Sequence, residues 1–138
     1  MAALPPLREP TFLILTALAL QPMHGYGIVR DVTALSGGRV ALRPGTLYGA
    51  LDRLGDEGLV EPDHEEVVDG RLRRYYRLTD TGRATLSAET ERLRRNVEAA
   101  SQRLRSHSEE TTPATGSPRG AARRPVSSPV LRPTGGPA

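Results

Sequence analysis

The chain of 138 residues contains no cysteine, which excludes a disulfide framework, a thiolate metal site and a cysteine nucleophile. This composition fits a reducing compartment, and we expect the protein in the cytoplasm. Lysine is absent as well, because all 19 basic residues are arginine. Such a replacement is typical of the coding bias of a GC-rich genome. The positions of the arginines are therefore more informative than the net charge of +3 or the pI of about 9.9.

Long hydrophobic runs are also absent. The main apolar stretch, FLILTALAL at residues 12–20, is far below the roughly 18 residues that span a bilayer. The residues before it hold one arginine and one glutamate, which is not the positive segment of a signal peptide. We interpret this stretch as part of a buried first helix and expect no membrane partner.

The sequence also lacks a constellation for catalysis. His24, His64 and His107 fall in three different predicted elements, and none shows metal-ligand spacing. A Gly-x-Ser-x-Gly nucleophile turn is missing. We interpret the pair Glu65-Glu66, in the first arm of the predicted hairpin, as a solvated acidic patch. We therefore predict no enzyme activity, no metal site and no cofactor.

Composition changes sharply near the C-terminus. Residues 107–138 hold half of the prolines among Ser, Thr, Gly and Ala, with few bulky apolar residues. Such a segment cannot bury enough apolar surface to offset the entropy of ordering it, so we predict a disordered tail. The folded part is then residues 7–106, a small core to which oligomerisation adds stability.

Hydrophobic periodicity predicts three short helices, over residues 7–20, from 24 or 25 to 35, and from Pro44 to just before Gly58. Between the last two, residues 39–42 form a short connector or minimal strand. Asp69-Gly70, between two extended runs, predicts a hairpin with a type I′ turn. On its second arm the alternation places Leu72, Tyr76 and Leu78 on the inward face.

A long amphipathic helix over residues 81–106 follows the hairpin. Its apolar positions have coiled-coil-like spacing: Leu86, Leu93, Val97, Ala100 and Leu104. The element order predicts an α+β, mainly α fold. We expect a winged helix-turn-helix over residues 1–80, with three helices and a two-stranded β-hairpin wing, followed by a C-terminal dimerisation helix.

The third predicted helix has one face suited to DNA. Its leucines point inward at helical spacing, which leaves the other side chains outside: Arg43, Thr46, Tyr48, Gly49 and Arg53. A smooth, mildly basic face with hydroxyls suits insertion into a major groove, and the helix start can approach a phosphate. Taken alone, this pattern also fits an ordinary surface helix.

The second arm of the hairpin carries the other basic cluster. Four arginines, Arg71, Arg73, Arg74 and Arg77, lie within seven residues near the hairpin tip. Such a local positive field favours contact with a sugar-phosphate backbone or an adjacent minor groove over a merely solvated charge run.

These segments resemble the PadR family of bacterial transcription regulators. The matching motifs are His24-Gly25-Tyr26 at the second helix, Pro44-Gly45-Thr46-Leu47-Tyr48 at the third, and the wing from Gly70 to Gly82. The resemblance spans about residues 7–106 and is closest to the short subfamily with one C-terminal helix. Arg43 departs from the family pattern, in which a serine commonly precedes Pro-Gly, so a good N-cap is lost.

The resemblance implies a homodimer held by the first and last helices, with Phe12 and Leu15 of the first helix joining the seam of the last. It also implies DNA contacts by Tyr26, Thr46, Tyr48, Arg71 and Arg74, and two recognition helices on an inverted repeat. Family members are mostly repressors, and some release DNA when an aromatic or drug-like molecule binds.

Two alternatives stay open. A small-molecule effector is one, although the chain has no Trp and only one Phe, which disfavours an aromatic sandwich around a planar ligand. A winged helix that binds a protein without sequence-specific DNA binding is the other, since a fold does not determine function. The four wing arginines favour a polyanion, such as double-stranded DNA, over a protein partner.

Overall fold

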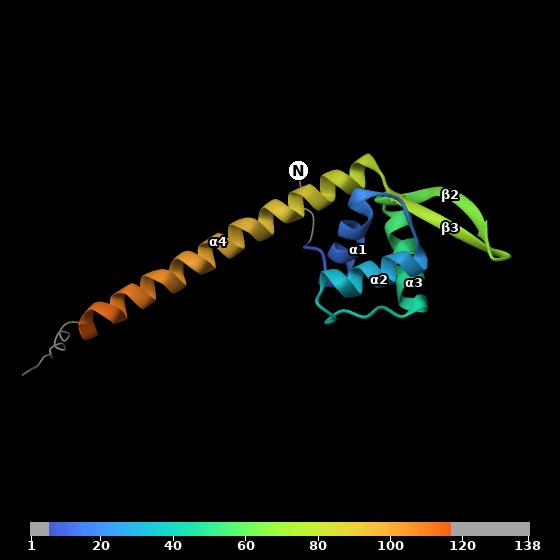
Figure 1. Cartoon of the computed structure of the whole chain (residues 1–138). Helices are drawn as coiled ribbons and strands as arrows, with labels where there is room; N and C mark the ends of the chain where they lie inside the picture. The colour runs from blue at the N-terminus through green and yellow to red at the C-terminus, as the bar shows by residue number, and fades with distance from the viewer. Residues whose placement is uncertain (1–5, 117–138) are drawn as a thin grey trace, which may run out of the picture. The chain divides into compact units, whose positions relative to one another are not determined.

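The computed structural model describes residues 6–116, and their side chains as far as residue 109. Over this range the chain forms four helices and three strands (Figure 1). They are α1 (Glu9–Leu20), β1 (Met23–His24), α2 (Gly25–Leu35), α3 (Pro44–Asp56), β2 (Val60–Val68), β3 (Arg71–Leu78) and α4 (Asp80–Gly116). The chain divides into two units, residues 1–93 and 94–138.

The first unit is built around one apolar core. Helix α1 is apolar on nearly every side and buries Ile14, Leu15 and Leu18 in this core. Helices α2 and α3 each bury a stripe at helical spacing, and Leu59, Val60 and Leu78 close the core from the sheet side. The predicted α+β, mainly α fold with three helices before a hairpin is confirmed.

Local chemistry sets the helix ends. Proline lies in the first turn of α1 and of α3, where its missing N–H has no helical partner to lose. Helix α2 ends at Ser36, and Gly37 and Gly38 follow with φ of 64° and 89°, in the left-handed region that favours glycine.

The three strands form an antiparallel sheet in the order β1-β3-β2. Asp69 and Gly70 join β2 to β3 with φ of 52° and 76°, and two positive φ values are what a type I′ turn requires. The predicted hairpin is therefore confirmed. An irregularity in register between Pro62 and Glu65 marks a β-bulge in β2.

Of the two alternatives predicted for residues 39–42, the structure has the connector and not the minimal strand. The third strand of the sheet lies at Met23–His24, which sequence reasoning did not predict; Met23 pairs with Tyr76 and His24 with Tyr75. Leu72 shares the alternating face with Tyr76 and Leu78, but the prediction that it packs inward was wrong, because it is 59 % exposed. It follows the Asp69-Gly70 turn closely, and this end of the hairpin extends past the helices (Figure 1).

The start of α4 is locked to the end of α3. The Thr79 hydroxyl donates to the Gly58 carbonyl (2.6 Å) and accepts from the Gly82 N–H (2.9 Å), and the Thr79 N–H donates to the Leu59 carbonyl (3.0 Å). Gly82 itself packs on Leu59: a Cβ at this position would lie 2.0 Å from the Leu59 carbonyl oxygen. Thr79 is thus the N-cap of α4, and only glycine fits at residue 82.

Within the first unit, α4 is also tied to the segment before α1. Glu89 is a buried carboxylate that accepts the Leu7 N–H at 3.1 Å and pairs with Arg92 at 2.6 Å. The Arg92 guanidinium lowers the pKa of Glu89, as expected for a carboxylate held by an opposite charge.

Helix α4 runs to Gly116, beyond Ser106 where we expected it to end. Residues 107–112 contain neither proline nor glycine, so nothing there interrupts the helical hydrogen-bond ladder. The rest of the predicted tail, residues 117–138, lies outside the described residues. Of the helices between residues 6 and 116, none combines the length and apolar character that a membrane span requires.

Candidate nucleic-acid interface

Helix α3 has the two faces that its sequence predicts. Leu47, Leu51 and Leu54 are buried, whereas the side expected to face DNA is exposed over its whole length. The exposed positions include all of the predicted ones on this helix and at its N-cap: Arg43, Thr46, Tyr48, Gly49 and Arg53. As expected, Arg43 makes no side-chain hydrogen bond to the helix start. The first-turn N–H groups are not capped by that side chain, which suits contact with an anion.

Tyr48 connects α3 to the start of α2. A Cβ on Gly25 would lie 2.3 Å from the Tyr48 hydroxyl oxygen, so the phenol ring rests directly on the Gly25 backbone. The ring is nevertheless 46 % exposed. Gly25 therefore fixes where the Tyr48 side chain lies while leaving its other side accessible.

Tyr26 lies on the same side of the molecule. It is 65 % exposed, and the Arg30 guanidinium lies 5.8 Å from the centroid of its ring, within cation–π range. The His24 ring is 6.5 Å from the Tyr26 ring and 5.3 Å from the Tyr75 ring, which links α2 to the hairpin.

The arginines of the wing fall into two classes. Arg77 pairs with Glu61 at 2.8 Å and with Asp63 at 3.2 Å, and Arg74 pairs with Glu65 at 3.2 Å. These carboxylates of β2 raise the pKa of both guanidinium groups.

By contrast, Arg71 and Arg73 form no ion pair with any residue in the described part of the chain. Glu65, which we interpreted as part of a solvated acidic patch, lies opposite Arg74 on the neighbouring strand and forms an ion pair with it. The positive field of the wing is concentrated on Arg71 and Arg73, close to the turn.

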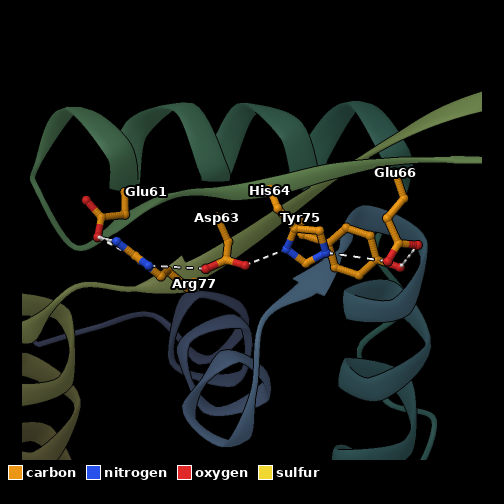
Figure 2. Close-up of polar contacts among 6 residues, drawn as sticks. All are labelled: Glu61, Asp63, His64, Glu66, Tyr75 and Arg77. Carbon is orange, nitrogen blue, oxygen red and sulfur yellow. Dashed lines mark hydrogen bonds and ion pairs between the residues drawn. The ribbon is translucent and has the colours of Figure 1, made fainter.

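A row of polar contacts covers one face of the sheet (Figure 2). It runs from Glu61 and Arg77 through Asp63 to His64, whose Nε2 lies 3.5 Å from Glu66. The His64 ring stacks on Tyr75 with centroids 4.3 Å apart, and the Tyr75 hydroxyl donates to Glu66 at 3.2 Å. The hydrogen bond to Asp63 raises the pKa of His64 and lowers that of Asp63.

His24 has the opposite electrostatic environment. Partial burial first, and then the nearby Arg73 guanidinium, lower the pKa of His24. Both effects favour the neutral form of the His24 ring.

Residues of α2, α3 and the wing line a groove of about 540 Å³, which lies between the start of α2, helix α3 and the hairpin tip. Its lining residues are His24, Gly25, Tyr26, Tyr48, Val68, Asp69, Arg71, Leu72, Arg73 and Arg74. The structure thus brings together five of the nine residues that we predicted to contact DNA, from two helices and the wing.

The other predicted contacts lie elsewhere on α3. Arg43, Thr46 and Gly49 are exposed but do not line this groove. Arg53 borders a separate hollow of about 450 Å³, formed with residues 6–8 and Thr11 near the start of α1. Sequence reasoning missed the place of His24 and Leu72 in the groove. The resemblance marked His24 only as part of a motif, and Leu72 was assigned to the core.

The predicted dimer contacts separate into buried and exposed sets. Leu15 has no exposed surface and belongs to the core of its own chain, so its assignment to an interface was wrong. Phe12, Leu86 and Leu93 are half-buried. In the second unit Ala100 is exposed, and Val97 and Leu104 are 62 % and 70 % exposed.

Between residues 6 and 109, no three histidine, aspartate or glutamate side chains are grouped so that they could hold a metal ion.

Comparison with known proteins identifies similar sequences. The chain is 41 % identical over 80 residues to the transcriptional regulator Rv3488 of Mycobacterium tuberculosis, which covers 58 % of this chain and 71 % of that protein. It is 45 % identical over 87 residues to a 37.1 kDa protein of transposon TN4556 from Streptomyces fradiae. That match covers 63 % of this chain but spans only 24 % of the length of the Streptomyces protein.

Solved structures share the fold. A PadR family transcription regulator from Clostridium difficile superposes with a TM-score of 0.59 and 25 % identity, over 70 % of this chain and 99 % of that one. Bacillus subtilis PadR in complex with operator DNA superposes with a TM-score of 0.52 and 24 % identity, over 59 % and 46 %. The model of the PadR-like family of transcriptional regulators matches residues 14–88. That match covers more than half of the chain, and the protein therefore belongs to the PadR-like family of transcriptional regulators.

Proposed function

We propose that the protein is a cytoplasmic homodimer that binds duplex DNA at an inverted repeat and represses transcription. The observation that carries the proposal is the groove in which Tyr26 and Tyr48 meet Arg71 and Arg73, two cations without a carboxylate partner among the described residues. Guanidinium groups beside tyrosine rings suit a polyanion that also offers base edges and sugar carbons, as duplex DNA does.

Helix α3 would enter the major groove. Its exposed side carries the Thr46 hydroxyl and the bare Gly49 backbone, next to which a Cβ would meet nothing within 4 Å. A face that is this smooth can approach base edges closely, while its hydroxyls donate or accept hydrogen bonds there.

The wing would contact the sugar-phosphate backbone of the DNA. Arg71 and Arg73 lie beside the turn, where a sugar-phosphate strand adjacent to the occupied major groove would pass. The Bacillus protein with this fold was solved in complex with operator DNA, which supports the same use of the fold here.

Dimerisation would place two copies of α3 on one duplex. Val97 and Leu104 are spaced by one heptad on α4 and are largely exposed in the single chain, as the seam of a coiled coil would be. Two recognition helices related by a twofold axis predict half-sites about 10 bp apart. Sedimentation equilibrium tests this step: Val97→Glu with Leu104→Glu should convert a dimer into a monomer.

A fluorescence-anisotropy titration of the upstream promoter fragment, with a scrambled duplex as control and several salt concentrations, tests the proposal. Tight binding that prefers the promoter and weakens steeply with salt is the expected result. Weak and equal binding to both duplexes would contradict it and would favour a protein-binding winged helix. Once binding is established, displacement of the DNA by planar aromatic compounds in the same assay tests for an effector.

A further inference from the structure

The inward stripe of the hairpin continues past the end of the core. Along β3, Leu78 is buried and Tyr76 packs against the core, but Leu72 is 59 % exposed. Val67 lies directly opposite Leu72 in the β2–β3 register and is 71 % exposed. The tip of the wing therefore carries two adjacent branched apolar side chains that the protein's own core does not cover.

Folding does not require this pair. The hairpin is already specified by the Asp69-Gly70 turn and by the ion pairs between β2 and β3. A single exposed leucine is ordinary, but two apolar side chains facing each other on a projecting tip form a surface suited to a partner.

The surroundings of the pair point to the class of partner. Leu72 lies between Arg71 and Arg73 in the sequence, and all three residues line the groove together with Tyr48. Neither arginine has a carboxylate partner among the described residues. The only carboxylate that lines the groove within the described residues is Asp69, at the turn. An apolar protein surface would leave both guanidinium groups without a counter-charge, which disfavours it.

We propose that Val67 and Leu72 form an apolar wing tip that packs against the deoxyribose rings along the minor groove, while Arg71 and Arg73 hold the flanking phosphates. The inference rests on the proposed function and adds to it a contact that is not electrostatic. Sugar carbons form the walls of the minor groove, and apolar side chains are a known means of contact there.

This division of roles has a distinct signature in salt titrations. Removing an arginine that contacts a phosphate lowers the slope of log affinity against log salt by about 0.9. Removing an apolar contact releases no counterion, so Leu72→Ser lowers the affinity by about tenfold at every salt concentration and leaves the slope unchanged.

Leu72→Ser and Val67→Ser are compared with wild type on the upstream promoter fragment. Leu72→Met is the conservative variant and should bind like wild type. Leu35→Ser is the matched control, because Leu35 is 48 % exposed at the far end of α2 and does not line the groove. Thermal melts of all variants should agree, since none of the three positions is buried.

Hydroxyl-radical footprinting supplies a readout at the sugars themselves. In the wild-type complex the deoxyriboses flanking each half-site should be protected, and Leu72→Ser should restore their cleavage. Normal DNA binding with unchanged affinity and footprint in Leu72→Ser and Val67→Ser would overturn the inference and leave the proposed function intact. A change of salt slope in Leu72→Ser would overturn it as well. Failure of the wild-type protein to bind any duplex would instead remove the proposed function, and this inference with it.

Discussion

Replacing Gly82 by alanine is expected to destabilise the fold, although alanine is the better helix former. The added Cβ would lie 2.0 Å from the Leu59 carbonyl oxygen and 2.9 Å from the carbonyl carbon. An ordinary carbon–oxygen contact is about 3.3–3.6 Å, so the start of α4 must move away from Leu59 by roughly an ångström. The obstacle is backbone, which cannot rotate aside.

The expected size follows from the contacts that this movement disturbs. Overpacking of this kind costs about 1–3 kcal/mol. Loss of the Thr79 cap on α4 adds about 1 kcal/mol, and loss of the hydrogen bond from Thr79 N–H to Leu59 adds about as much. The better helix propensity of alanine returns up to about 1 kcal/mol. We therefore expect a net loss of about 2–4 kcal/mol in the free energy of unfolding.

Urea denaturation followed by circular dichroism measures this change, at one protein concentration because a dimer would make the stability depend on it. Gly49→Ala is the matched control. It makes the same substitution inside a helix but meets nothing within 4 Å, so it should gain up to about 1 kcal/mol. If the Gly82→Ala protein is as stable as wild type, the close packing of Gly82 on Leu59 does not limit this position.

Two further predictions concern the interface, and a third concerns the pH dependence of stability. Gly25→Ala places a Cβ 2.3 Å from the Tyr48 hydroxyl, which is the end of a flexible side chain and can move aside. The variant should therefore fold normally but bind the promoter more weakly in anisotropy titrations. Unchanged binding would show that Tyr48 is not part of the contact surface. Glu65→Gln removes the carboxylate that pairs with Arg74, so the affinity for DNA and its salt slope should both rise, whereas no change would show that Arg74 does not reach a phosphate. The hydrogen bond to Asp63 raises the pKa of His64 in the folded protein. This bond therefore stabilises the fold fully below the pKa of about 6.5 that His64 has in the unfolded chain. The stabilisation is lost as the pH rises through the folded-state pKa. The stability difference between wild type and His64→Gln should accordingly shrink with rising pH in urea titrations, and a constant difference would contradict that role.

The elements that sequence predicted correctly are specified by local chemistry. Leu47, Leu51 and Leu54 recur at helical spacing, and Asp69-Gly70 has the conformational preference of a tight turn, so both could be assigned without knowledge of tertiary contacts. The exposed face of α3 followed from the same periodicity.

The features that sequence reasoning missed depend on contacts between distant segments. The pairing of Arg74 with Glu65 depends on the strand register, which includes a β-bulge after Pro62 that no motif signals. Burial of Leu15 and exposure of Leu72 depend on where the core ends. Leu15 lies on a helix that is apolar on nearly every side, and Leu72 lies on an alternating strand. Neither pattern tells whether a neighbouring element of the same chain lies over the residue. Strand β1 has two residues, too few for any alternation to be visible.

In the proposed complex, duplex DNA occupies the groove between α3 and the wing and is held by Arg71 and Arg73. The most direct test compares the salt dependence of promoter binding for wild type, the double variant Arg71→Ala with Arg73→Ala, and Arg77→Ala. Arg77 is the matched control because it lies on the same strand but is held by Glu61 and Asp63. We predict that the double variant lowers the log–log slope by about 0.9 for each phosphate contact removed, and that Arg77→Ala leaves it nearly unchanged. Equal slopes for all three proteins, or equal binding of promoter and scrambled duplex by the wild type, would contradict the account.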